Sequence, residues 1–505
     1  MVPRAELGNF AMPTSPLSPT LPSAESRMRR REFTRLVFVV VALTVFLRLP
    51  AFFVEVFNSD ETFLATQALV INHGGTLYKD AADRKPPLVP YIYAATFSVF
   101  GTDELWTVRV VAMGAAALTA LLLAAEARRR YGRRAMWMAA ILCSVSLVAF
   151  APQDGQAANF EIFMLPAMTA AVLLARRGRG FGAGVAVAAA TMAKQTGVAA
   201  LIPVFYLLAR RQGRKGVSDA AMGFAIPTAL VAIAVGPGQL LYWTVLGNGS
   251  YVDLHTASGY VLGKLSLMTL TWAACNLPIL WRLPQAWRER RVHPRDGGSD
   301  TDLWLWALSG VLAVAVGLRF FGHYYMQLVP PLCLLSAGAL SRGGRRIAIG
   351  TMAFAAVAAF AFSAAGYFMK PFGHPVPYAS VSRYLDVNAR PTDRILVWGA
   401  TPEIYWASGL EPATRFLATP SFLGETHPGR PPESSSPADS DPKVWQWFFH
   451  DLGAHPPQFV LDTSPADTRS SDTTPIQEFP TFQRYLDDNY HLVAVIDRIN
   501  VYERK

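Results

Sequence analysis

The chain has 505 residues, of which 52% are hydrophobic and only 16% charged, and its formal net charge is +10. Several apolar runs approach the ~20 residues that a helix needs to cross a bilayer, so the composition excludes an ordinary soluble protein and predicts an all-α polytopic membrane region. Nucleic acid would suit the positive charge, but Lys and Arg are gathered in short clusters between the apolar runs, which is typical of cytoplasmic loops next to anionic lipid. We therefore expect membrane lipid as a partner and no nucleic acid. The clusters span residues 128–134, 176–179, 210–215, 288–295 and 342–346.

The N-terminal residues 1–32 are predicted to form a disordered cytoplasmic tail, because residues 1–26 are rich in Pro and Ser. A basic cluster follows, and then an apolar stretch at 33–57 that is too long for a cleaved signal peptide and has no small-residue cleavage site. This stretch is predicted to be the first membrane span, with its N-terminus inside.

Residues 58–101 contain no uninterrupted apolar run of spanning length, so they are predicted to form a first outer loop with interfacial helices. One helix should run from Glu61 to Asn72 and end at the glycines 74 and 75, because glycine favours a helix end. A second helix should begin at the prolines 86 and 87 and continue to Phe100, because proline is tolerated in the first turn of a helix.

The remaining apolar runs predict further spans up to residue 369. When the basic loops are placed in the cytoplasm, the total is about eleven spans and the C-terminus lies outside. The expected spans are 104–126, 135–151, 158–175, 217–236, 265–283, 303–320, 324–340 and 347–368, together with two from a hairpin at 181–209.

The hairpin at 181–209 carries the polar segment AKQTG (Ala193–Gly197) in its middle and has basic residues on both flanks. Its tip should therefore face outward. Each arm has only about 13 residues, or about 20 Å of helix, which is short of the ~30 Å hydrocarbon core. We expect Lys194 and Gln195 to lie below the outer surface in a water-filled cavity.

Residues 370–505 lose the membrane pattern and predict a soluble α/β domain outside the membrane. Alternating apolar residues predict strands at 393–400 and 458–464, and a closing hairpin formed by HLVAVID and INVYER. Helical spacing predicts helices at PEIYWASGL, KVWQWFFHDLG and TFQRYLDDNY.

Five polar interruptions all fall on the predicted outer side and are expected to line one cavity. Ionisable groups at membrane depth cost about 2.5–3.5 kcal/mol each, so they are candidates for function. Other roles stay open: Arg84 and Lys85 as headgroup contacts, Glu161 as a partner of Lys194 alone, and His323 as a structural residue. The interruptions are Asp60–Glu61, Arg84–Lys85, Asn159–Glu161, Lys194–Gln195 and the group Arg319, His323, Tyr324 and Tyr325.

The segment DRKPPL (Asp83–Leu88) predicts a phosphate site. Its prolines start a helix whose N-terminal dipole acts together with the charges of Arg84 and Lys85, and at a membrane surface the expected phosphate is that of a lipid. A carboxylate at Asp60 can accept a proton from a nucleophile that attacks a carbon whose leaving group is this phosphate. The loop therefore predicts group transfer from a lipid-phosphate carrier.

At these residues the chain resembles the polyprenyl-phosphate-dependent glycosyltransferases of the GT-C superfamily, in particular bacterial relatives of protein O-mannosyltransferases and of the lipid A aminoarabinose transferase. The resemblance covers roughly residues 33–368 and implies a GT-C membrane domain at 33–369. Besides the first outer loop it rests on TVRV, NFEIFMLP, AKQTG and RFFGHYYMQLVPP.

The resemblance implies an inverting transfer in which Asp60 is the base and Glu61 positions the acceptor or shares that role. Lys85 and Arg84 would hold the lipid phosphate, and Lys194 would offset its charge. The residues expected to line the substrate site are Glu161, Gln195, Arg319, His323 and Tyr324.

No sugar nucleotide and no metal cofactor are expected, and the outer loops carry no DxD motif; a divalent ion at Asp60, Glu61 and Glu161 stays open. The acceptor would be a glycan, lipid or protein of the cell envelope. The C-terminal domain does not resemble the lumenal domain of the mannosyltransferases, so transfer to protein is not implied; one role for it is to select the acceptor.

The chain is thus expected in the cytoplasmic membrane, with its active site and C-terminal domain outside. The alternatives are a transporter or flippase of a lipid-linked sugar, which should show inverted repeats and broken helices, and an inactive sugar-lipid binding protein. We find no internal repeat.

Overall fold

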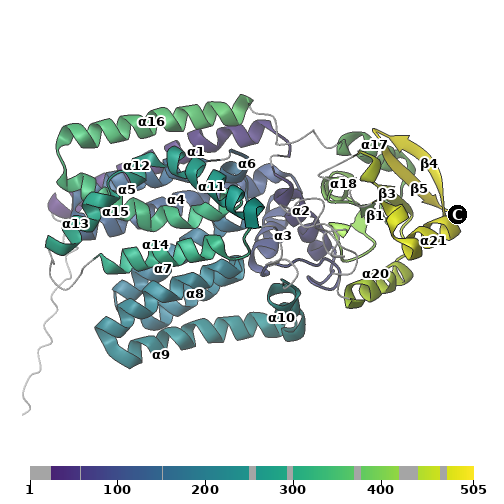
Figure 1. The fold of residues 1–505 in the computed structure, drawn as a ribbon, viewed down its shortest axis with the longest axis horizontal. Helices are drawn as coiled ribbons and strands as arrows, with labels where there is room; N and C mark the ends of the chain where they lie inside the picture. Colours follow the sequence, from purple (N-terminus) through teal and green to yellow (C-terminus); the bar gives the residue numbers. More distant parts are fainter. Residues whose placement is uncertain are drawn as a thin grey trace, which may run out of the picture. The chain divides into compact units, whose positions relative to one another are not determined.

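A computed structural model describes residues 24–56, 58–150, 152–248, 258–292, 300–368, 377–419, 442–466 and 475–505. The described chain up to Phe368 is mostly helical, and the five strands of the described sheet lie between Arg394 and Arg504 (Figure 1). The predicted helical region followed by a smaller α/β region is therefore confirmed. Residues 40–505 form one of two compact units.

The helices that precede the sheet are mostly short. They are α1 (Ala24–Arg48), α2 (Ser59–Asn72), α3 (Leu88–Phe100), α4 (Leu105–Tyr131), α5 (Arg133–Ser146), α6 (Pro152–Gln156), α7 (Phe160–Arg176), α8 (Gly180–Ala193), α9 (Leu201–Val235), α10 (Pro237–Thr244), α11 (Ser258–Cys275), α12 (Leu277–Leu280), α13 (Leu283–Val292), α14 (Thr301–Ala315), α15 (Val329–Arg342) and α16 (Arg345–Phe368).

Three helical segments in the described part of the chain are long and apolar enough to cross a membrane: Arg31–Phe53, Leu105–Tyr131 and Gln195–Val235. Shorter apolar helices accompany them, at Leu88–Phe100, Gly180–Ala193 and Thr301–Ala315. The predicted total of about eleven spans is not confirmed. Polar or irregular segments end several of the expected spans early; α14 stops at Ala315, for example.

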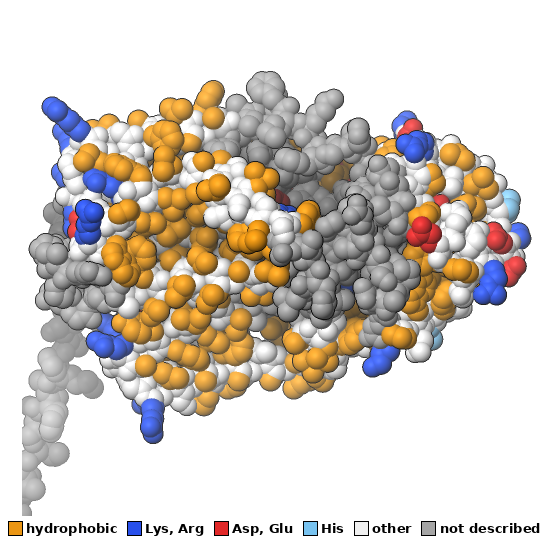
Figure 2. All heavy atoms as spheres, viewed as in Figure 1, with side chains coloured by type: hydrophobic (Ala, Val, Ile, Leu, Met, Phe, Trp, Pro, Cys, Tyr) orange, Lys and Arg blue, Asp and Glu red, His pale blue; other side chains and the backbone are white. Residues whose placement is uncertain are grey.

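Large apolar side chains cover the outside of the helical region. Leu230, Ile233 and Val357 are each more than half exposed, and Figure 2 shows such side chains spread over the visible face. A monomeric soluble protein rarely exposes so continuous an apolar surface. Such an apolar surface is stable in contact with membrane lipid.

The first outer loop has the two predicted helices. α2 ends at Asn72 and is followed by Gly74, which has a φ of 89°, and α3 begins directly after Pro86 and Pro87. The N-terminal boundary differs from the expectation, because α1 already begins at Ala24 within the predicted tail. Residues 1–23 of that tail and the domain boundary at 369–370 lie outside the described residues.

The predicted hairpin is confirmed. α8 ends at Ala193, Lys194 is extended with a φ of −155°, and a 3-10 helix (Gln195–Ala200) leads into α9. Gly197 lies so close to the backbone of Ala190 that a side chain would not fit. α9 is interrupted at Gly213, whose φ of 63° turns the chain within the basic cluster at 210–215.

The sheet has the strand order β2-β1-β3-β5-β4. β1 (Arg394–Trp398) pairs in parallel with β2 (Glu411–Pro412) and with β3 (Phe459–Asp462). β4 (Tyr490–Ile496) and β5 (Ile499–Arg504) form the predicted closing hairpin, and β5 continues antiparallel to β3. The accompanying helices are α17 (Tyr378–Asn388), α18 (Glu403–Ser408), α20 (Pro442–Ala454) and α21 (Pro480–Asn489).

The first outer loop is part of the core of the α/β region. Leu77 and Tyr78 are completely buried in one hydrophobic cluster with Trp398, and the Ala82 amide donates a hydrogen bond of 2.7 Å to the carbonyl of Arg415. Burying each large apolar side chain contributes about 1.5–3 kcal/mol. The α/β region therefore holds the segment that leads into Lys85.

Candidate functional site

The start of α2 presents two carboxylates in different environments. The Asn58 side chain caps the helix by accepting the Asp60 amide at 2.9 Å, which places Asp60 and Glu61 in the first turn, where the helix dipole favours negative charge. The Asp60 side chain is 31% exposed, whereas that of Glu61 is completely buried. Only Asp60 is accessible to a substrate.

Lys85 meets Asp60. Its ammonium lies 3.9 Å from the Asp60 carboxylate and 4.1 Å from the centre of the Phe160 ring. The Tyr78 hydroxyl fixes the backbone by donating a hydrogen bond of 2.8 Å to the Lys85 carbonyl. The structure thus brings together the two charges, predicted from separate motifs, that we call the Asp60–Lys85 pair.

A second group of charges, the Glu161 cluster, consists of Asp154, Glu161, Lys194 and His323. Lys194 forms an ion pair with Glu161. His323 lies between two carboxylates: its Nδ1 is 2.9 Å from Asp154 Oδ1, and its Nε2 is 3.8 Å from Glu161 Oε1. Lys194 also lies 3.8 Å from the centre of the Tyr324 ring. Four predicted residues, Glu161, Lys194, His323 and Tyr324, are therefore neighbours.

Consecutive residues at the start of α7 join the two groups, since Phe160 contacts Lys85 and Glu161 contacts Lys194. Gln195 adds a second link, because its amide nitrogen donates to the Arg84 carbonyl at 2.5 Å. Arg84 itself is half-buried. The predicted residues from the first outer loop, α7 and the hairpin tip form one contiguous site.

Arg319 occupies a strained part of the chain. It is buried and stands between Leu318 and Phe320, which have φ values of 55° and 50°, a region that costs a non-glycine residue roughly 1 kcal/mol or more. It interacts electrostatically with Lys264, whose ammonium lies 4.6 Å from the Phe321 ring centre. Arg319 thus adds positive charge in the segment that leads to His323.

Arg109 is a site residue that was not predicted. Its guanidinium makes two bonds to the Glu61 carboxylate, at 2.7 and 3.1 Å, and donates to the carbonyls of Val54 and Glu55 at 2.7 and 3.0 Å. The Ala158 amide donates to Glu61 Oε1 at 2.9 Å. The Glu61 carboxylate therefore links α2 to α4 through Arg109 and to the start of α7 through the Ala158 amide. An arginine inside an apolar run was the available signal in the sequence.

Asp154 and Asp83 were also not predicted. The Asp154 carboxylate contacts His323 and lies 3.4 Å from the Asn58 side chain. Asp83 is buried, and its Oδ2 has no hydrogen-bond partner among the described residues. Burial raises the pKa of Asp83 to about 6, and the Asp60 charge adds to this shift, while Lys85 opposes it.

Asp83→Asn should change how stability depends on pH. A carboxyl whose pKa is raised on folding stabilises the fold while protonated, so this contribution is present below the unfolded pKa and is lost as the pH rises through about 6. Asn resembles the protonated form. We therefore expect the free energy of unfolding of the variant to increase relative to that of wild type by roughly 3 kcal/mol at most between about pH 4 and pH 8. Thermal unfolding of both proteins across this range measures the effect. If the difference in stability between the variant and wild type were the same at pH 4 and pH 8, the raised pKa of Asp83 would be contradicted.

The carboxylates considered as metal ligands are engaged by cations. Glu61 is paired with Arg109, and Glu161 with Lys194. Within the described ranges, no group of three or more His, Cys, Asp or Glu side chains is arranged to hold a metal ion.

Residues 84–243 match the family model described as dolichyl-phosphate-mannose-protein mannosyltransferase. The matched segment begins at Arg84 and includes Lys85, Glu161 and Lys194, three residues of the site. None of the curated proteins compared with the chain matches it.

Solved structures show that the fold is similar to that of GT-C enzymes. The crystal structure of ArnT from Cupriavidus metallidurans bound to undecaprenyl phosphate is similar, with a TM-score of 0.62 at 15% identity over 95% of this chain and 98% of that chain. So is archaeal oligosaccharyltransferase AglB from Archaeoglobus fulgidus in complex with an inhibitory peptide and a dolichol-phosphate, with a TM-score of 0.58 at 12% identity over 95% of this chain and 75% of that one. The resemblance to the GT-C superfamily of polyprenyl-phosphate-dependent glycosyltransferases is confirmed.

Proposed function

We propose that the chain is an inverting glycosyltransferase of the cytoplasmic membrane, which moves a sugar from a polyprenyl-phosphate carrier to an acceptor of the cell envelope. The observation that carries the proposal is the Asp60–Lys85 pair, in which a partly exposed carboxylate and an ammonium lie 3.9 Å apart at the start of α3. Such a transfer requires a base and a phosphate-binding cation in the same site.

In this mechanism Asp60 accepts the proton of the acceptor nucleophile as that nucleophile attacks the anomeric carbon. The bond between the anomeric carbon and the phosphate oxygen breaks, and its electron pair leaves with the polyprenyl phosphate. Attack from the face opposite the leaving group inverts the carbon. Asp60 then loses its proton to water.

Lys85, supported by Arg84, stabilises the negative charge that develops on the departing phosphate. Lys194 adds positive charge from the hairpin tip, and its ion pair with Glu161 holds it in place. His323 and Tyr324 line the donor site beside it, and Gln195 fixes the backbone of Arg84. In this scheme Glu61 positions α2 through Arg109 and does not touch the acceptor.

The helix ends support a site on the extracytoplasmic side. α4, α7 and α15 each carry arginine in their last turn. At the opposite ends, Glu161 lies in the first turn of α7, and the 3-10 helix Gly322–Leu328, which contains His323, leads into α15. Lys194 lies at the end of α8 that is away from the basic residue Arg179. If the basic ends face the cytoplasm, the site faces outward.

A transfer assay in proteoliposomes tests the function. The full chain is reconstituted with polyprenyl-phosphate-linked sugars and extracted envelope acceptors, and both the glycosylated product and the free carrier are measured. Formation of product and free carrier in equal amounts supports the enzyme. Movement of intact donor across the bilayer without cleavage would instead support a transporter.

Lys85→Ala should weaken donor binding about 10- to 100-fold, because a charge-assisted contact to phosphate is removed. Binding of polyprenyl phosphate to the detergent-solubilised variant measures this directly. Lys79→Ala is the matched control, because Lys79 is an exposed lysine of the same loop. Unchanged affinity in the Lys85 variant, or equal loss in the control, would remove Lys85 from the phosphate site.

A further inference from the structure

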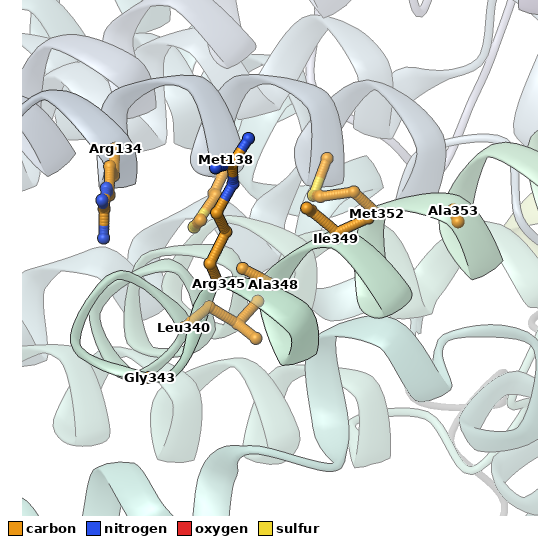
Figure 3. A pocket seen from close by; sticks show the side chains of 9 residues that line it. All are labelled: Arg134, Met138, Leu340, Gly343, Arg345, Ala348, Ile349, Met352 and Ala353. Carbon is orange, nitrogen blue, oxygen red and sulfur yellow. The ribbon is translucent and has the colours of Figure 1, made fainter.

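A groove lies between α5 and α16, next to the end of α15, at the basic ends of these helices. It has a volume of about 510 Å³. Figure 3 shows Arg134 at one end of it, Arg345 beside Met138, and the apolar side chains of Ile349 and Met352 beyond them toward Ala353. It belongs to the end of α15 opposite His323, so it is not part of the candidate active site.

The two arginines of the groove differ from the basic residues around them. Arg130 is bound by Glu126 and Asp302, and Arg342 is bound by Glu289. Arg134 and Arg345, in contrast, are exposed, and neither has an ion-pair partner among the described side chains. No acidic residue lines the groove. Two positive charges are therefore available to an anion.

The rest of the groove suits an acyl chain. Beyond the arginines its lining is apolar, and Ile349 and the neighbouring Phe354 are about half exposed, at 56% and 49%, on a helix whose outer face is apolar. α5 and α16 both begin at the charged end, so their first amides add positive potential there. The positive end of the groove suits the phosphate of a phospholipid, and the apolar channel that leads away from it suits an acyl chain.

We propose that this groove binds an anionic phospholipid from the leaflet at the basic ends of the helices. The lipid phosphate lies between Arg134 and Arg345, and one acyl chain follows Met138, Ile349 and Met352. The site is independent of the proposed transfer reaction. A free phosphate would use only the charged end, whereas a neutral lipid would not need the arginines.

Native mass spectrometry of the delipidated full-length chain tests the site. Phosphatidylglycerol and phosphatidylcholine with identical acyl chains are titrated in turn. Wild type should retain phosphatidylglycerol roughly tenfold or more better, because each guanidinium contributes a charge-assisted bond. The double variant Arg134→Gln with Arg345→Gln should lose this preference. The matched control, Arg129→Gln with Arg346→Gln, removes the same charge from exposed neighbours and should keep it.

A third variant tests the apolar part. Ala353→Trp should narrow the channel and lower retention of phosphatidylglycerol while both arginines remain. Equal retention of the two lipids by wild type would overturn the proposal, as would equal loss in the control pair. It would also be overturned if inorganic phosphate displaced the lipid completely, or if polyprenyl phosphate bound in preference to it.

Discussion

Asp60→Asn should lower the rate of glycosyl transfer by roughly 10²- to 10⁴-fold, the usual contribution of a positioned general base. Asn has nearly the shape of Asp but cannot take the acceptor proton. Because Lys85 stays in place 3.9 Å away, the donor phosphate should still bind, with affinity changed only slightly by the loss of one negative charge. The expected signature is a large fall in kcat with little change in donor affinity.

The measurement is single-turnover transfer in proteoliposomes, with donor binding determined on the same preparation. Asp103→Asn provides the control, because Asp103 is an exposed aspartate that follows α3, and it should transfer at the wild-type rate. Full turnover by the Asp60 variant would show that another group is the base.

Arg109→Met should destabilise the fold by about 3–5 kcal/mol, the cost of leaving a buried carboxylate without its partner. The side chains of Arg109 and Glu61 are only 3% and 0% exposed, so water cannot replace the lost ion pair. The variant also removes donors from the carbonyls of Val54 and Glu55. Because methionine fills a similar volume, the loss of stability reflects mainly the missing charge and hydrogen bonds.

A double-mutant cycle separates these contributions. Glu61→Gln combined with Arg109→Met should be less destabilised than the sum of the two single variants, because the unpaired charge is gone. Arg129→Met, an exposed change on the same helix, should stay within about 0.5 kcal/mol of wild type. Thermal and denaturant unfolding in one detergent give all four values. A loss of under about 1 kcal/mol for Arg109→Met would contradict the role assigned to the pair.

Features with a local cause could be predicted from the sequence. The prolines at 86–87 start α3, and AKQTG breaks the hairpin between α8 and α9. Alternating apolar residues gave β1, β3 and the β4–β5 hairpin. Lys85, Lys194 and His323 stood out because charge or imidazole near membrane depth needs a partner.

Features that depend on contacts between distant segments could not be predicted. Glu61 has the same local setting as Asp60, and only its ion pair with Arg109, 48 residues further along the chain, separates their roles. Asp154 contacts His323, which lies 169 residues further along the chain, and its local sequence does not indicate this contact. The two-residue strand β2 has too few residues for a periodic pattern.

The most direct test of the account is a structure of the full chain with polyprenyl phosphate bound in a lipid nanodisc. We expect the phosphate to lie within hydrogen-bond distance, about 3 Å, of the Lys85 ammonium at the start of α3, on the side from which Asp60 can reach the attacking nucleophile. A phosphate bound away from Lys85, with Asp60 facing a different cavity, would contradict it.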